Sequence, residues 1–192
     1  MRTWNLRSSD LFLAVLAVAA ILAIAAPAKI HAQAAPTASK TAGLSVFGGW
    51  VRVAPDYGPQ INYGGIFGAD YYRYIHSHFV PALEFRGKVT NEHTVSEKTF
   101  GGGLHLEYPI KRLHPYATFL ISYGIIDFNP AIAPGGPQYP SDNSIVYSYG
   151  AGVDFDINKR WAAKFDFQSE YWNLDPITLT PTAITLGATF RF

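Results

Sequence analysis

The sequence contains no cysteine. It therefore has no disulfide framework, no thiolate metal site and no cysteine nucleophile. Charged residues make up only 15% of the 192 residues, and a formal net charge of +1 provides no basic field for nucleic acid. Aromatic residues are abundant at 15%, and a hydrophobic fraction of 48% excludes a disordered chain. A chain of this length is expected to form one domain.

The N-terminal segment is typical of a secretory signal peptide. Two arginines precede an apolar run without charge over residues 11–26. This run is shorter than the roughly 20 residues that a membrane-spanning helix needs. Small residues before position 35 fit a cleavage site, so we predict a signal peptide over residues 1–34. Residues 26–28 (Ala-Pro-Ala) also fit a cleavage site, and an uncleaved membrane anchor is the alternative.

The remaining chain alternates between apolar and polar residues. From Ile184 to Phe192 every second residue is apolar, and from Trp161 to Tyr171 apolar side chains alternate with mainly charged or polar ones. This period of two predicts β-strands with one apolar face and one solvated face. After a short flexible lead-in over 35–42, we predict a β-barrel domain over 43–192 with eight such strands: 43–54, 61–73, 79–89, 97–108, 115–128, 144–156, 161–173 and 182–192.

Two of these strands are less regular. The alternation in 43–54 slips at Gly48-Gly49, which predicts a bulge, and 115–128 is apolar on both faces, which leaves its phase open. Short turns alternate with longer loops between the strands, and the longest loop covers 129–143. An even number of antiparallel strands with this alternation is typical of an outer-membrane barrel.

The apolar faces are expected to point outward into lipid. Eight strands enclose space for side chains or one small ligand, so the many bulky apolar side chains cannot all fit inside. Aromatic residues also mark the strand ends, as girdles at bilayer interfaces do. The short-turn end has Tyr71, Tyr72, Tyr74, Phe79, Tyr108, Tyr116, Phe155, Trp161, Phe190 and Phe192, and the opposite end has Trp50, Tyr63, Tyr147, Tyr171 and Trp172. A water-soluble, lipocalin-like barrel is the alternative.

These features together resemble those of a known family. The signal peptide, the eight amphipathic strands and the final Thr-Leu-Gly-Ala-Thr-Phe-Arg-Phe192 are similar to outer-membrane barrels related to the OmpA transmembrane domain and to OmpW. The resemblance implies an all-β, eight-stranded, up-and-down transmembrane barrel in the outer membrane. It also implies that the barrel assembly machinery reads the C-terminal strand ending in Phe192.

The polar faces predict a charged lumen. We assign to it Arg52, Asp70, Glu84, Arg86, Lys88, His105, Glu107, Asp154, Asp156, Lys164, Asp166, Glu170 and Arg191. Buried charges are costly unless paired, so we expect a network of ion pairs that fills the lumen, for example between Lys164 or Arg191 and the aspartates of 144–156. A narrow ion path is the alternative. We expect no metal or cofactor, because His76 and His78 in a turn lack carboxylate support.

The predicted function is a structural or surface-interaction role without catalysis. Expected partners are outer-membrane lipids and a protein or small solute at the loops, but no nucleic acid. The first alternative is a channel or transporter for small or hydrophobic solutes, with an apolar pocket formed by Ile125, Ile126, Phe128 and the loop 129–143. The second alternative is a lipid-modifying hydrolase that depends on Ser96 or Ser144.

Overall fold

The computed structural model describes residues 42–56, 60–74, 78–91, 95–128, 141–174 and 177–192. The predicted signal peptide and the predicted lead-in up to residue 41 lie outside these ranges. The described residues contain no helix that is long and apolar enough to cross a membrane.

Nine β-strands form the described fold: β1 (Ala42–Ala54), β2 (Asn62–Arg73), β3 (Val80–Asn91), β4 (Val95–Glu107), β5 (Leu113–Phe128), β6 (Asp142–Asp156), β7 (Trp161–Leu174), β8 (Ile177–Leu179) and β9 (Thr182–Arg191). The eight predicted strands agree with β1 to β7 and β9 to within two residues at each end. β8 falls in a segment predicted as a loop.

The short strand β8 continues the line of β9. Both pair with β7 in one register, with Trp172 opposite Leu179 and Ser169 opposite Thr182. Pro181 lies between them and has no N–H to donate, so the strand is interrupted there. β8 and β9 therefore act as one strand of the wall.

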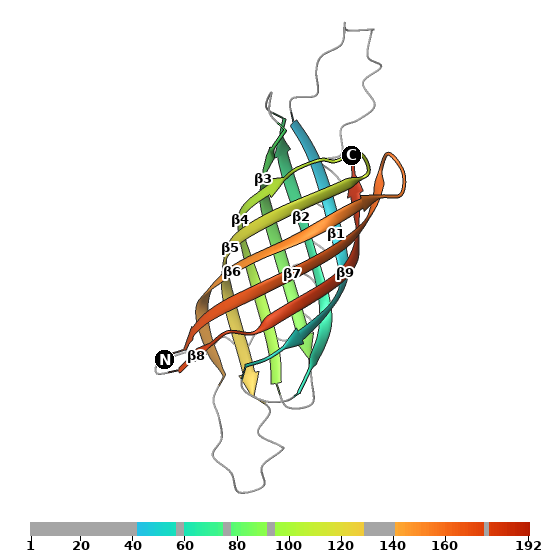
Figure 1. The fold of residues 1–192 in the computed structure, drawn as a ribbon. Coiled ribbons are helices and arrows are strands. Elements are labelled where there is room, and N and C mark those ends of the chain that lie inside the picture. The colour runs from blue at the N-terminus through green and yellow to red at the C-terminus, as the bar shows by residue number, and fades with distance from the viewer. Residues whose placement is uncertain (1–41, 57–59, 75–77, 92–94, 129–140, 175–176) are drawn as a thin grey trace, which may run out of the picture. The chain divides into compact units, whose positions relative to one another are not determined.

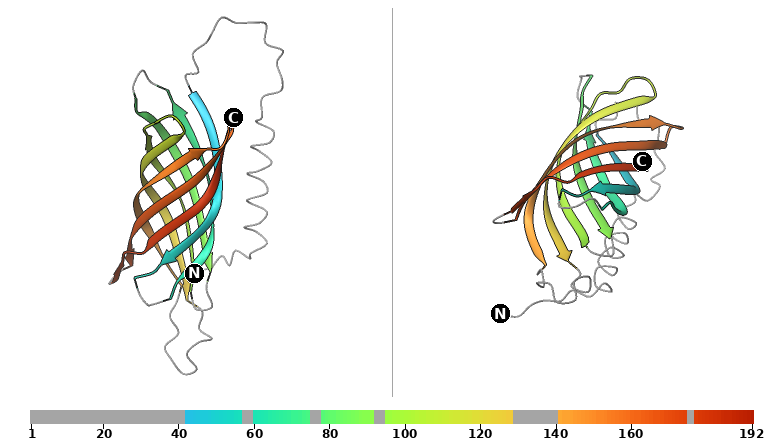
Figure 2. Two further views of the ribbon diagram at one scale, coloured as in Figure 1. Left: turned by 45° about the vertical axis from the view of Figure 1, so that its right-hand side comes forward. Right: turned by 60° about the horizontal axis from the view of Figure 1, so that its bottom comes forward.

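The sheet closes into an eight-stranded antiparallel barrel (Figures 1 and 2). Neighbouring strands pair in chain order, and β9 pairs with both β7 and β1. The register is staggered around the wall, because a row of paired residues that begins at Leu44 returns to β1 at Ala54, ten positions further on (54 minus 44). Strands with such a stagger must tilt strongly, as Figure 1 shows. Eight tilted strands leave room inside mainly for side chains.

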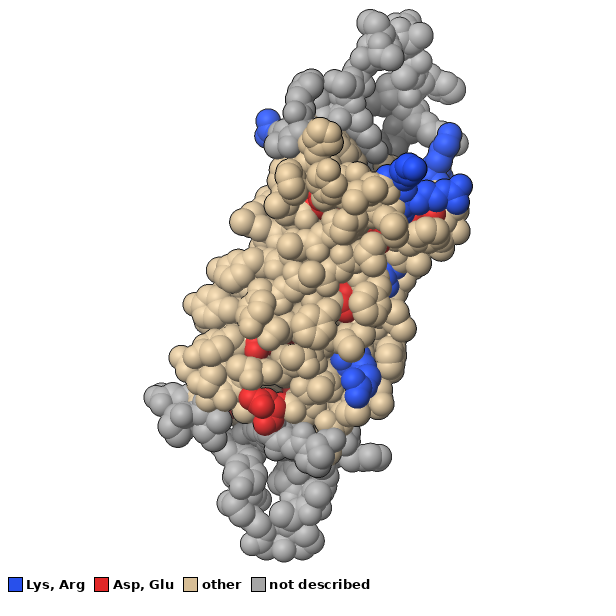
Figure 3. Space-filling view, in the orientation of Figure 1, with Lys and Arg blue, Asp and Glu red and all other residues tan. Residues whose placement is uncertain are grey.

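Large apolar side chains point outward along the whole wall. Leu83, Phe85, Leu104, Tyr149 and Leu186 are each more than half exposed. The visible face of the barrel shows few charged atoms between its two ends (Figure 3). Exposed apolar residues on every strand and buried polar residues opposite them are the reverse of a water-soluble barrel.

The structure gives the register and the inward face of the two irregular strands. β1 pairs with β2 in one unbroken register from Ala42 to Val53, so the bulge predicted at Gly48-Gly49 is wrong. Phe47 and Val53 face the lumen. In β5, the inward set includes Tyr116, Thr118, Leu120 and Ser122, while Phe119, Ile121 and Tyr123 face outward.

The predicted short-turn girdle lies at one end of the barrel. Tyr71, Phe79, Tyr108, Phe155, Trp161 and Phe192 are exposed there, and Phe190 packs between Trp161 and Phe192 with ring centroids 4.9 and 5.1 Å away. Three other aromatic residues assigned to the girdles, Tyr72, Tyr116 and Trp172, are instead buried in the lumen. Neighbouring residues of a strand lie on opposite faces, so the position of these three residues in the strand directs them inward although they are aromatic.

Inward glycines make room for these buried rings. A Cβ atom at Gly152 would lie 2.4 Å from the Tyr116 ring, and one at Gly124 would lie 2.5 Å from the Trp172 ring. The lumen is therefore packed with aromatic side chains as well as charged ones.

Candidate functional site

The lumen holds most of the charged residues of the strands. All but one of the predicted lumen residues face inward: Asp70, Glu84, Arg86, Lys88, His105, Glu107, Asp154, Asp156, Lys164, Asp166, Glu170 and Arg191. The assignment of Arg52 to the lumen is wrong. Arg52 lies between the buried residues Val51 and Val53, and opposite the outward-facing Tyr63, so strand alternation places it on the outer face.

Arg86 forms the central link across the lumen. Its Nε donates to Glu84 Oε1 at 2.6 Å, and its two terminal nitrogens donate to the oxygens of Asp166 at 3.0 and 3.2 Å. The Tyr116 hydroxyl donates to the same Asp166 carboxylate at 2.8 Å. Because β3 and β7 lie on different sides of the barrel, this bidentate pair ties opposite walls together.

A second ion pair crosses the lumen nearer the loops. Lys88 Nζ donates to Glu170 Oε1 at 2.5 Å, and the Trp172 indole N–H donates to the other oxygen of Glu170 at 2.9 Å. Towards the loops the interior becomes apolar, with a buried cluster of Val95, Ile126, Val146, Trp172, Leu174 and Leu179. Ile126 thus lies in the lumen, whereas the side chain of Phe128 lies outside the described residues.

Another set of ion pairs occupies the short-turn end. Lys164 Nζ donates to Asp154 at 3.2 Å, and it lies 4.1 Å from the centroid of the Tyr116 ring. Arg191 donates to Asp156. These two pairs join β6 to its neighbour β7 and, past β7, to β9.

His114 also belongs to the lumen. Its Nδ1 lies 2.6 Å from Glu107 and its Nε2 lies 2.9 Å from Asp156. The predicted strand over 115–128 leaves His114 in the preceding turn, whereas β5 begins at Leu113 and directs His114 inward.

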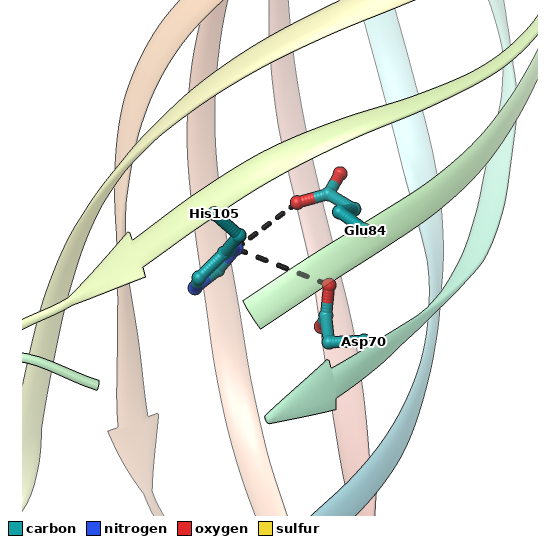
Figure 4. A group of neighbouring side chains, drawn as sticks. All are labelled: Asp70, Glu84 and His105. Atoms are coloured by element: carbon teal, nitrogen blue, oxygen red, sulfur yellow. Dashed lines mark hydrogen bonds and ion pairs between the residues drawn. The ribbon is translucent and has the colours of Figure 1, made fainter. Parts of the chain in front are cut away.

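Three further side chains gather on β2, β3 and β4 (Figure 4). His105 Nδ1 lies 3.0 Å from Glu84 Oε2 and 3.9 Å from Asp70 Oδ1. The other oxygen of Asp70 accepts hydrogen bonds from the hydroxyls of Ser45 and Tyr72, at 3.1 and 3.3 Å. The imidazole stacks on the Tyr116 ring, with centroids 4.5 Å apart. The group is thus held in place by packing and hydrogen bonds.

Glu97 is a lumen residue that the sequence did not identify. Its side chain is buried and accepts a hydrogen bond from Asn62 at 3.2 Å. The strand was predicted to begin at Glu97, whereas β4 begins at Val95. Two-residue spacing from the inward Thr99 is the signal that places Glu97 inside.

A small cavity lies between the lumen side chains. The described residues enclose a cavity of about 10 Å³, which is enough for about one water molecule. Arg86, Lys88, Leu120, Gln168 and Thr185 are among the residues that line it.

The serines proposed for a hydrolase have other partners. Ser144 donates to the backbone carbonyl oxygen of Asn173 at 2.8 Å, and Ser96 lies opposite Asn91 and Asp127 in the wall. Within the described ranges, no hydrogen bond joins either serine to a histidine. His93, three residues before Ser96 in the sequence, lies outside the described residues.

Comparison with known proteins identifies the family. A model for the outer membrane protein β-barrel domain matches residues 14–192. Neisserial surface protein A is a structural neighbour, with a TM-score of 0.57, 13% identity, and coverage of 79% of this chain and 97% of that chain. The N-terminal barrel of Pseudomonas aeruginosa OprF has a TM-score of 0.54, 15% identity, and coverage of 77% and 97%.

Ail, the attachment invasion locus protein of Yersinia pestis, has a similar fold. Its complex with the heparin analogue sucrose octasulfate has a TM-score of 0.50 and 18% identity, and covers 79% of this chain and 97% of that chain. No curated protein sequence matches. The family model, the closed eight-stranded wall and its apolar outer surface agree, and the chain belongs to the outer-membrane protein β-barrel family of the cell outer membrane.

Proposed function

We propose that this protein is a filled, non-catalytic barrel whose lumen conducts no ions, and that its role is structural or lies in surface interactions. One observation carries the proposal: ion pairs from opposite walls cross the lumen and leave a cavity of about 10 Å³. A conducting barrel needs a continuous water path, and the packed Arg86 and Lys88 side chains interrupt such a path.

The proposed partners are lipids, the assembly machinery and a ligand of the loops. The exposed apolar wall contacts outer-membrane lipids. The assembly machinery recognises the C-terminal strand that ends in Phe192. A surface ligand is favoured by the fold alone, since the Ail barrel has been crystallised with a heparin analogue. Most of the longest loop, residues 129–140, lies outside the described residues.

Planar bilayer recordings test the proposal. We expect refolded protein, with folding shown by a heat-modifiable shift in gel mobility, to give no discrete channels where a porin reconstituted in parallel does. The reason is that the cavity of about 10 Å³ in the described lumen has room for about one water molecule.

The opposite result identifies a channel. Discrete, reproducible conductance steps that change size in Lys164→Gln or Arg191→Gln would show that ions pass the charged lumen. They would replace the proposed role with solute transport. A matched control is Lys98→Gln, because Lys98 pairs with Asp127 on the outer face and its change leaves the lumen untouched.

A further inference from the structure

Two carboxylates face each other directly inside the barrel. Asp70 on β2 is paired in register with Glu84 on β3, and both side chains point into the lumen (Figure 4). His105 on β4 is paired with Ala82, two residues from Glu84, so it occupies the diagonal position on the same face. Like charges at directly opposite positions are destabilising unless positive charge lies between them.

One oxygen of each carboxylate is directed at the histidine. Asp70 Oδ1, Glu84 Oε2 and His105 Nδ1 all lie within 4.8 Å of one another. The remaining oxygens are engaged elsewhere, Glu84 Oε1 by Arg86 and Asp70 Oδ2 by Ser45 and Tyr72. The arrangement leaves three potential ligand atoms converging on one point.

Unpartnered polar atoms are concentrated at this point. Asp70 Oδ1, His105 Nε2 and Glu107 Oε2 are buried and have no hydrogen-bond partner. Asp70 and His105 are 0% and 1% exposed. Buried polar atoms without hydrogen bonds are rare in native proteins, and a bound ion is one way to satisfy them.

A protonated histidine alone does not satisfy the group. An imidazolium donates from Nδ1 to Glu84 and directs Nε2–H at Glu107, whose Oε2 lies 4.0 Å away. Asp70 Oδ1 still accepts no hydrogen bond, because it lies 3.9 Å from His105 Nδ1. Inward carboxylates also outnumber inward cations: Asp70, Glu84, Glu97, Glu107, Asp154, Asp156, Asp166 and Glu170 face Arg86, Lys88, Lys164, Arg191 and two histidines.

We propose that Asp70, Glu84 and His105 bind a divalent transition-metal ion of the zinc type. A mixed set of imidazole nitrogen and carboxylate oxygens suits this class of ion, with water at a remaining position. Metal on Nδ1 places the ring proton on Nε2, directed towards the unpartnered Glu107 oxygen. Such a second carboxylate behind a metal-bound histidine is a common supporting contact. The site ties three adjacent strands together.

The metal content of refolded protein tests this site. We expect untagged wild-type protein, refolded with Zn²⁺ and then freed of excess metal on a desalting column, to retain about one zinc ion per barrel. Asp70→Asn and His105→Gln are expected to retain less than about a tenth of this amount, because each removes a ligand. The heat-modifiable gel shift shows which variants have folded.

Two control variants locate the ion. His114→Gln removes the other lumen histidine and is expected to retain zinc, as is the double variant His76→Ala and His78→Ala, which lies before β3 in the sequence. Wild-type protein without bound zinc would overturn the proposal, and so would zinc retained in Asp70→Asn but lost in the turn variant.

A second measurement does not require every variant to fold equally well. Zinc is expected to raise the unfolding temperature of wild-type protein and to leave that of His105→Gln unchanged. Equal shifts in both proteins would contradict the site. Neither experiment depends on conductance, so the metal site and the filled lumen are tested separately.

Discussion

Replacing Leu186 with arginine is expected to destabilise the folded barrel by about 2–4 kcal/mol. Leu186 lies in the middle of β9, is 54% exposed, and has Trp50 and Phe165 beside it on the neighbouring strands. The cost arises because the guanidinium must enter hydrocarbon near the bilayer midplane. Urea-dependent unfolding in lipid vesicles measures the change in the free energy of unfolding.

A matched control lies at the edge of the membrane. Ile157 is an exposed aliphatic residue in the turn between β6 and β7, and Ile157→Arg is expected to cost less than about 1 kcal/mol because the charge remains near water. Equal effects at the two positions would mean that the outer wall does not contact lipid.

Replacing Arg86 with methionine is expected to destabilise the barrel by about 3–5 kcal/mol. The substitution leaves the carboxylates of Glu84 and Asp166 buried, both with 0% side-chain exposure, without their shared cation. Adding Asp166→Asn is expected to recover part of the loss, because one of the uncompensated charges is removed while the Tyr116 hydroxyl keeps an acceptor. The same unfolding assay measures both variants.

An ion pair on the outer face of the barrel serves as the control for Arg86→Met. Lys98 and Asp127 form a partly exposed pair 3.2 Å apart, and Lys98→Met is expected to cost at most about 1 kcal/mol. If Arg86→Met lowers the free energy of unfolding by less than about 1 kcal/mol, the lumen is hydrated well enough to screen Glu84 and Asp166. The proposal of a filled lumen would then be wrong.

The sequence predicts the wall better than the lumen. Strand positions follow from the period of two, which is imposed by the alternation of side chains across a sheet. The same alternation directs Asp70, Glu84 and Lys164 inward. The assignment of Arg52 to the lumen is wrong because β1 directs the apolar Phe47 and Val53 inward, where polar side chains were expected.

Contacts across the lumen cannot be predicted from sequence patterns. Arg86 and Asp166 are 80 residues apart and meet because the wall is staggered by ten positions around the barrel. Pairs on adjacent strands, such as Lys164 with Asp154, follow from strand order alone. The barrel fold can therefore be predicted from the strand pattern and the family resemblance. The ion pairs across the lumen and the site at His105 are visible only once the register of the strands is known.

Thiol accessibility tests the filled, lipid-embedded barrel most directly. Because the chain has no cysteine, single variants give a clean background. Thr185→Cys probes the lumen at a residue that lines the small cavity, Leu186→Cys probes the outer wall next to it, and Ile157→Cys probes a turn in water.

A small charged thiol reagent is added to each folded variant in lipid vesicles. We expect rapid reaction at position 157, no reaction at 185 or 186, and reaction at all three positions after unfolding. Reaction at 185 as fast as at 157 would show an open, water-filled lumen, and reaction at 186 would show that the apolar wall faces water.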